Sequence, residues 1–120
     1  MGRIVHFELP TTNGAASRKF YETVFGWKFT KFAGPTEYWL VSTGAPDEMG
    51  IDGGLGGAAN EFMATVNTVG VDDVDATVKA VLANGGQVVA PKDEIPGMGY
   101  LAYVKDREKF FQDTLQKQRK

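Results

Sequence analysis

The stretch Phe20-Tyr21-Glu22-Thr23-Val24-Phe25-Gly26-Trp27 passes from a helical pattern to a strand pattern, and it decides the fold. Apolar residues recur at helical spacing up to Phe25, and Gly26 stands where a left-handed residue commonly ends a helix. Upstream, Thr11-Thr12-Asn13-Gly14 supplies side chains that can cap a first turn. The sequence therefore predicts a helix over residues 15–25 that is followed directly by a strand.

The segment from Arg3 to Leu9, closed by Pro10, alternates in the way that is typical of a strand. Positions 5, 7 and 9 are apolar and are expected to pack on helices, whereas His6 and Glu8 lie on the opposite face. Because this polar pair points away from the helices, we expect it to point into a cleft.

The second half of the chain repeats the order of the first with a period of about 60 residues. After the first helix, strands are predicted over residues 27–32, 37–43 and about 49–55. In the second half, Val71-Asp72-Asp73-Val74 opens a helix that runs to about residue 83, and the predicted strands cover residues 61–69, 87–90 and 98–105.

This order is β-α-β-β-β twice, and neither half could bury a helix-covered sheet alone. We therefore expect an α+β fold in which two modules, residues 3–57 and 61–120, form a single domain over residues 1–120. Three consecutive strands after the first helix argue against a ferredoxin-like fold.

Composition excludes several classes of site, because the 120 residues include no cysteine and a single histidine. Without cysteine there is no disulfide, thiolate nucleophile or iron–sulfur ligation. One histidine excludes any site that needs two imidazoles from one chain. The absence of cysteine fits a cytoplasmic protein, and no apolar run reaches the length of a membrane span.

The formal net charge of −2 is unevenly distributed along the chain. Residues 105–120 contain six basic and three acidic residues, whereas the preceding residues contain seven and twelve. An acidic body disfavours binding to a phosphate backbone, and a short basic tail is typical of a solvated chain end. We therefore expect no nucleic-acid partner.

Six strings of residues together resemble the glyoxalase/bleomycin-resistance superfamily, also called the vicinal oxygen chelate superfamily, which includes extradiol dioxygenases. These strings are Ile4–Pro10, Phe20–Trp27, Gly50–Leu55, Val71–Thr77, Asn84–Gly86 and Ile95–Tyr100. The resemblance covers residues 3 to about 106 and implies paired βαβββ modules whose eight strands curl around a cleft. It says less about the reaction, because the superfamily includes isomerases, ring-cleaving oxygenases, thiol transferases and drug-binding proteins.

The resemblance also implies where a metal would bind, because metal-dependent members take ligands from the first strand of each module and from a carboxylate on the last strand. The first position corresponds to His6, the only histidine candidate. The second falls at Val66 or Asn67, of which valine cannot ligate and asparagine is a weak donor. The family's usual run into the last strand is missing. The resemblance therefore implies no complete catalytic metal site, and a divalent metal held weakly by His6 and Glu8 is left open.

The tail itself is ambiguous, because Phe110, Phe111 and Leu115 with polar residues between them suit a terminal helix at least as well as an eighth strand. The last strand of the second module is therefore predicted to be atypical.

Four aromatic side chains on strands are candidates for stacking on a planar ligand: Tyr38, Trp39, Tyr100 and Tyr103. Because about half of the side chains on such strands must face the helices, we expect one of the first two and one of the last two in the cleft. With His6, Glu8 and Asn67 they form the predicted ligand-binding set.

Two functions from different classes follow. One is a small-molecule-binding protein of the glyoxalase/bleomycin-resistance type without a catalytic metal, and the alternative is a metal-dependent lyase or dioxygenase of the same superfamily. The missing ligands favour the first, and an acid/base pair of His6 and Glu8 acting on an enolisable substrate is also left open. Members often dimerise, and an incomplete eighth strand would leave a sheet edge uncovered, so we expect a homodimer.

Overall fold

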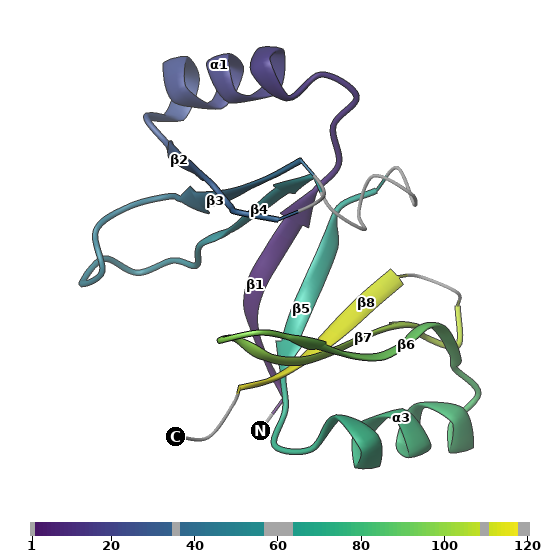
Figure 1. Cartoon of the computed structure of the whole chain (residues 1–120). Helices are drawn as coiled ribbons and strands as arrows, with labels where there is room; N and C mark the ends of the chain where they lie inside the picture. Colours follow the sequence, from purple (N-terminus) through teal and green to yellow (C-terminus); the bar gives the residue numbers. More distant parts are fainter. Residues whose placement is uncertain (1, 35–36, 57–63, 109–110, 118–120) are drawn as a thin grey trace. The chain divides into compact units, whose positions relative to one another are not determined.

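The computed structural model describes residues 2–34, 37–56, 64–108 and 111–117, and Figure 1 traces the chain. The first half contains β1 (Arg3–Leu9), α1 (Gly14–Phe25), β2 (Lys28–Lys31), β3 (Tyr38–Ser42) and β4 (Gly53–Gly56). The second half contains β5 (Val66–Gly70), α3 (Val74–Ala83), β6 (Gln87–Ile95), β7 (Gly99–Lys105) and β8 (Phe111–Lys117). The predicted α+β class and the repeated βαβββ order are confirmed.

The chain separates into two compact units, residues 6–66 and residues 1–5 together with 67–120. We call them the first and the second unit. The strand order is β2-β3-β4-β1 in the first half of the chain and β5-β8-β7-β6 in the second. In both halves one parallel pair, β1 with β4 or β5 with β8, joins antiparallel neighbours.

The core of the first unit lies on one face of its sheet. Leu55 of β4 is fully buried and is in register with Leu9 of β1 and Trp39 of β3. Val41 completes the buried cluster, and the partly buried side chains packed against it are Phe7, Leu9, Trp27 and Phe29. Phe7 and Leu9 therefore lie on the face predicted for them, whereas Val5, which was predicted to lie on the same face and pack on helices, is 42% exposed and does not belong to this core.

Helix α1 begins after Asn13, whose Oδ1 accepts a hydrogen bond from the backbone N–H of Ala16 at 3.0 Å, and it ends at Gly26 with φ 72°. Gly14 in its first turn lies against the indole of Trp39, since a Cβ there would be 2.6 Å from a ring atom. The guanidinium carbon of Arg18 lies 4.5 Å from the centre of the same ring. The first turn and Arg18 thus hold α1 against β3.

The apolar stripe expected on this helix is not buried, which corrects the sequence-based interpretation. Phe20, Val24 and Phe25 are each more than half exposed. The rings of Phe20 and Phe25 instead belong to an aromatic cluster in which Tyr21 stacks on Trp27 with a centroid separation of 4.9 Å. Spacing gave the helix correctly but not the side that faces the sheet, because the glycine at position 14 lets Trp39 approach a different side.

The tail forms an ordinary strand, which settles the ambiguity between a helix and a strand. Strand β8 pairs in parallel with β5 and antiparallel with β7. The Oγ1 of its buried Thr114 donates a hydrogen bond to the carbonyl oxygen of Ala102 at 3.4 Å. A segment with a helical apolar pattern becomes a strand here because two neighbouring strands offer it backbone hydrogen bonds on both sides.

Strand β6 is longer than predicted, because residues 91–95 were expected to form a loop. The register between β6 and β7 shifts between Val88 and Ala90 and again between Ala90 and Asp93. Pro91 is tolerated between these irregularities because β6 is the edge strand of its half, where a proline that lacks an N–H breaks no ladder on the outer side.

Candidate functional site

The polar face of the first unit is the side of its sheet opposite the Trp39–Leu55 core. His6 and Glu8 lie on this face of β1, since Phe7 and Leu9 between and beside them pack on the core. Glu8 is in register with Gly54 of β4, which is in turn in register with Leu40 of β3. Residues in register share a face, so these strands contribute to one surface, which we call the His6 face.

Tyr38 brings a phenol hydroxyl to this face. Its Oη lies 3.4 Å from the Nε2 of His6, although the two residues are 32 positions apart in the sequence. The ring can lie over β4 because Gly54 has no side chain, and a Cβ there would collide with the Oη and Cζ of Tyr38. The structure thus brings together three of the predicted residues: His6, Glu8 and Tyr38.

Burial lowers the pKa of His6 below its usual value of 6.5, and the negative charge of Asp52 raises it in part. Asp52 is itself fixed, because its Oδ1 accepts a hydrogen bond from the backbone N–H of Thr43 at 2.9 Å. A lowered pKa favours the neutral imidazole near pH 7. Neutral imidazole has one donor and one acceptor nitrogen, so it can accept a proton or a hydrogen bond.

Glu8 is buried to 6% exposure and takes part in an interaction of its own. A carboxylate in this position is held in place by its surroundings instead of being solvated. The His6 face therefore combines an anchored carboxylate, a neutral imidazole and a phenol, with the exposed side chain of Leu40 beside them.

Trp39 does not belong to this face. It is 8% exposed and lies in the core, on the opposite side of β3 from Tyr38. Its large ring packs under Gly14 and Arg18, so its role in the first unit is to join α1 to the sheet.

The predicted residues of the second unit fall on two different faces. Strand register links Asn67 through Gln112 to Val104, and it links Thr68 through Asp113 to Tyr103. Tyr103 is buried and Asn67 is half-buried. Asn67 and Tyr103 therefore do not share a face.

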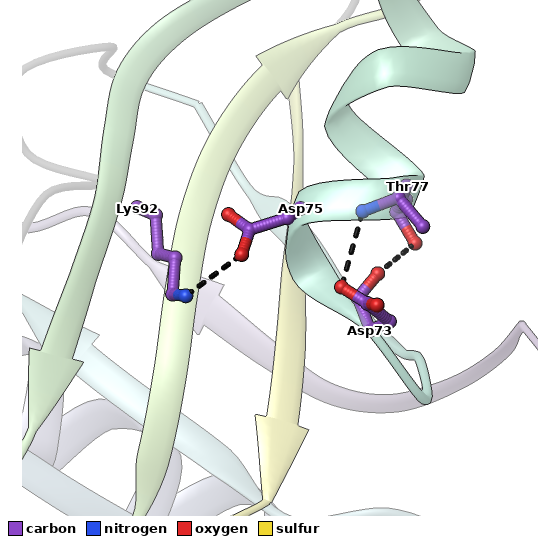
Figure 2. Close-up of polar contacts among 5 residues, drawn as sticks. Asp73, Asp75, Thr77 and Lys92 are labelled. Atoms are coloured by element: carbon purple, nitrogen blue, oxygen red, sulfur yellow. Dashed lines mark hydrogen bonds and ion pairs between the residues drawn. The ribbon is translucent and has the colours of Figure 1, made fainter.

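Tyr100 lies three positions before Tyr103 on β7, so the two side chains are on opposite faces of the strand. Tyr100 contacts Lys92, which pairs with α3. Lys92 lies with its Nζ 4.7 Å from the centre of the Tyr100 ring and 2.9 Å from the Oδ2 of Asp75 in the first turn of α3. Figure 2 shows this ion pair beside the cap of α3, where Thr77 donates both its N–H and its hydroxyl to the carbonyl oxygen of Asp73. Tyr100 thus packs in a link between β6 and α3.

Thr68 is a residue that the sequence-based reasoning missed. It is 2% exposed, and its Oγ1 has no hydrogen-bond partner among the side chains and backbone groups that the structure describes. The available signal was the repeat itself, because a displacement of 60 residues that relates His6 to Val66 relates Glu8 to Thr68. A buried hydroxyl without a partner is unusual and suggests a role beyond packing.

The residues of the His6 face do not fit a transition-metal site. Within the ranges that the structure describes, no three His, Asp or Glu side chains are grouped so as to hold a metal ion. The Nε2 of His6 lies against Tyr38, and the buried carboxylate of Glu8 is already engaged. Such sites normally need three protein donors, so we derive no step through a metal.

Comparison with known proteins identifies the family. Residues 3–44 match the family model described as bleomycin resistance protein-like N-terminal. A glyoxylase-like domain-containing protein of Didymella fabae is 33% identical over 90 residues, which is 72% of this chain and 70% of that protein. The chain belongs to the glyoxalase/bleomycin-resistance superfamily.

A second member of this superfamily that resembles the chain is CFP32 of Mycobacterium tuberculosis, which is named as a glyoxylase. It is 32% identical over 103 residues, which is 82% of this chain and 40% of that protein. The chain thus spans about two fifths of the length of the first curated relatives it matches.

Solved structures of the superfamily agree in fold at low sequence identity. The Bacillus halodurans protein BH1468 has a TM-score of 0.74 at 11% identity and covers 99% of this chain and 96% of its own. A methylmalonyl-CoA epimerase of Streptomyces coelicolor, in complex with 2-nitronate-propionyl-CoA, has a TM-score of 0.72 at 14% identity, with 98% of both chains covered. No helix in the described part of this chain is both long and apolar enough to cross a membrane.

Proposed function

We propose that this chain binds a small molecule on the His6 face without a complete catalytic metal site. The observation that carries the proposal is the approach of the Tyr38 hydroxyl to the His6 imidazole across Gly54. Sites for small molecules typically combine a few convergent polar groups with apolar surface, and this face has both. The alternative, a metal-dependent lyase or dioxygenase, needs ligands that the described residues do not bring together.

The polar groups of this face set the kind of ligand that we expect. The lowered pKa of His6 favours its neutral form near pH 7, and the negative charge of Asp52, in the segment directly before β4, acts on it. A ligand group that meets the His6–Tyr38 pair would therefore be uncharged or cationic, because the charge of Asp52 would repel an anion. The proposed site comprises residues of the first unit only, so it does not include Asn67, Tyr100 or Tyr103.

The test follows the single histidine by NMR. The imidazole signals of His6 are recorded for protein purified without a histidine tag, during titration with matched neutral and anionic probes such as benzamide and benzoate. We expect saturable shifts with benzamide and weaker ones with benzoate, with the shifts retained in Thr23→Ala, an exposed change on α1, which packs on the core side of the sheet. Equal response to both probes, or none to either across a wider fragment set, would overturn the proposal.

Metal analysis separates the alternative function. Elemental analysis of the same untagged protein is expected to show less than one divalent metal per chain, and no turnover of methylglyoxal–thiol adducts or catechols. Stoichiometric metal that is lost in His6→Ala, together with turnover, would establish the enzyme and refute the proposal that the chain only binds.

We also propose that the protein is a homodimer and that its two units form one domain. An uncovered sheet edge at an incomplete eighth strand does not support dimerisation, because β8 is formed and lies between β5 and β7. The frequent dimerisation of this superfamily and the exposed apolar residues of α1 support the proposal. Sedimentation velocity over a range of concentrations tests it, and a monomer at every concentration would refute it.

A further inference from the structure

Strand β4 is composed of Gly53-Gly54-Leu55-Gly56, so three of its four residues have no side chain, yet all four are buried. Neighbouring groups occupy the space that side chains would take. A Cβ on Gly53 would be 2.6 Å from the ring of Phe7, and one on Gly56 would be 2.7 Å from the carbonyl oxygen of Glu37. A Cβ on Gly54 would coincide with the hydroxyl end of Tyr38.

The contact at Gly54 differs from the others because it lies on the His6 face. Gly53 is covered by a ring that belongs to the core, and Gly56 is constrained by backbone with φ +101°. Gly54 is instead covered by the one aromatic side chain whose hydroxyl reaches His6. The absence of a side chain at Gly54 therefore affects the position of Tyr38 on the His6 face and not the packing of the core.

We propose that Gly54 is a specificity-determining position, because it seats the Tyr38 ring on β4 and thereby brings the Tyr38 hydroxyl to His6. This inference rests on the proposed binding function of the His6 face. Any larger residue at position 54 would displace the ring and leave the imidazole without the phenol. The seated ring also fills the space above β4, so the ligand meets the edge of the His6–Tyr38 pair and not the strand.

The groups that act on His6 are few, which makes the contact measurable. Tyr38 reaches it from β3, Asp52 acts on it from the segment before β4, and Glu8 lies two positions along its own strand. The three heavy atoms nearest to a Cβ on Gly54 all belong to the side chain of Tyr38, so a methyl group there meets Tyr38 before either carboxylate. A change in the imidazole after substitution at position 54 therefore reports movement of Tyr38.

The experiment is an NMR titration of the His6 imidazole in Gly54→Ala and Tyr38→Phe, without any ligand. We expect both substitutions to change the pKa of His6 in the same direction, by about half a unit or more, because each removes the same hydrogen bond. Val41→Ala is the control, since it loses buried volume from the neighbouring strand on the core side without touching the contact. It is expected to lower stability and leave the titration unchanged.

If Gly54→Ala folds too poorly for NMR, the stability of the double variant Tyr38→Ala/Gly54→Ala still tests the proposed contact. In a Tyr38→Ala background the space above β4 is empty, so adding Gly54→Ala should cost much less stability than it does beside Tyr38. An equal cost in both backgrounds would overturn the proposal, as would a His6 titration that moves in Tyr38→Phe but not in a folded Gly54→Ala.

Ligand binding then separates this inference from the function on which it rests. If benzamide binds the wild-type protein and binds Gly54→Ala at least threefold more weakly, both stand. If benzamide binds both equally while the His6 titration differs, the function stands and the specificity role is refuted. If it binds neither while the titration differs as expected, Gly54 positions Tyr38 but the proposed function fails.

Discussion

Replacing Leu55 by alanine tests whether the core beneath the His6 face holds its strands together. Leu55 is fully buried, and its register partners are Leu9 and Trp39 on the two flanking strands. Replacing leucine by alanine removes an isopropyl group and forfeits about 2–2.5 kcal/mol of transfer free energy, at roughly 0.8 kcal/mol for each of three buried carbon groups. The cavity adds about 1–2 kcal/mol, because the strand backbones and the large indole cannot collapse into it. We expect a loss of about 3–4 kcal/mol.

The assay is urea unfolding followed by tryptophan fluorescence. Both tryptophans of the chain, Trp27 and Trp39, pack in the core of the first unit, so the signal reports on that unit. With a slope of about 1–3 kcal/mol/M, the midpoint should fall by about 1–4 M. The control is Leu40→Ala, the same chemical change in the same unit at a position that is 37% exposed, which should cost clearly less than Leu55→Ala. Equal losses in the two variants would show that β4 is not the centre of this core.

Three further outcomes are expected. Because the pKa of His6 is lowered on folding, the unfolded state binds the proton more readily, so the free energy of unfolding should fall as the pH drops through 6.5. His6→Gln should flatten this pH dependence. An unchanged pH dependence in the variant would contradict a lowered pKa of His6. Thr68→Val should raise the free energy of unfolding by about 1 kcal/mol in the ligand-free protein, since it removes a buried hydroxyl that has no partner among the described residues. Urea unfolding measures this change. A lower free energy of unfolding in the variant would mean that the hydroxyl has a hydrogen-bond partner. Asp73→Ala should cost about 1 kcal/mol, because its Oδ1 accepts a hydrogen bond from the N–H of Ala76 at 3.1 Å, whereas Asp72→Ala should change the same measurement by less than half of that.

The fold was predictable because its signals are local. The alternation in residues 3–9, the cap at Asn13 and the left-handed Gly26 each act within a few residues, and each is found where the pattern indicated. The same holds for α3, which begins directly after its cap Asp73, within the stretch Val71-Asp72-Asp73-Val74 that was expected to open a helix. Such local signals are independent of where the rest of the chain goes.

The errors come from interactions between segments that are distant in the sequence. Residues 111–117 form a strand because β5 and β7 flank them, and no property of the segment alone shows this. The exposed side of α1 was misjudged for the same reason, since the approach of Trp39 to Gly14 depends on two residues 25 positions apart. Tertiary contacts thus outweighed the local apolar spacing of these two segments.

The candidate site was predictable only in its first strand. Alternation placed His6 and Glu8 on one face, but it could not choose between Tyr38 and Trp39, because both registers are consistent with a strand. The choice is made by Gly54, whose missing side chain admits the phenol, and by Gly14, whose missing side chain admits the indole. Glycines that make room for a distant ring leave no periodic signal.

The two halves of the repeat show why the fold is easier to infer than the function. At the start of each helix, Asn13 and Asp73 cap the first turn, and the residues that follow, Gly14 and Val74, are buried. These positions must keep their chemistry because each half has to bury its own helix against its own sheet.

The positions of His6 and Glu8, by contrast, carry different chemistry in the two halves, although Glu8, Val66 and Thr68 are all buried. His6 and Glu8 on β1 correspond, 60 residues later, to Val66 and Thr68 on β5, so an ionisable pair is matched by a methyl-bearing pair. Both versions fold, which means that folding does not dictate what these positions hold. Because folding does not require an ionisable pair at these positions, ligand binding is the better explanation for His6 and Glu8 on β1.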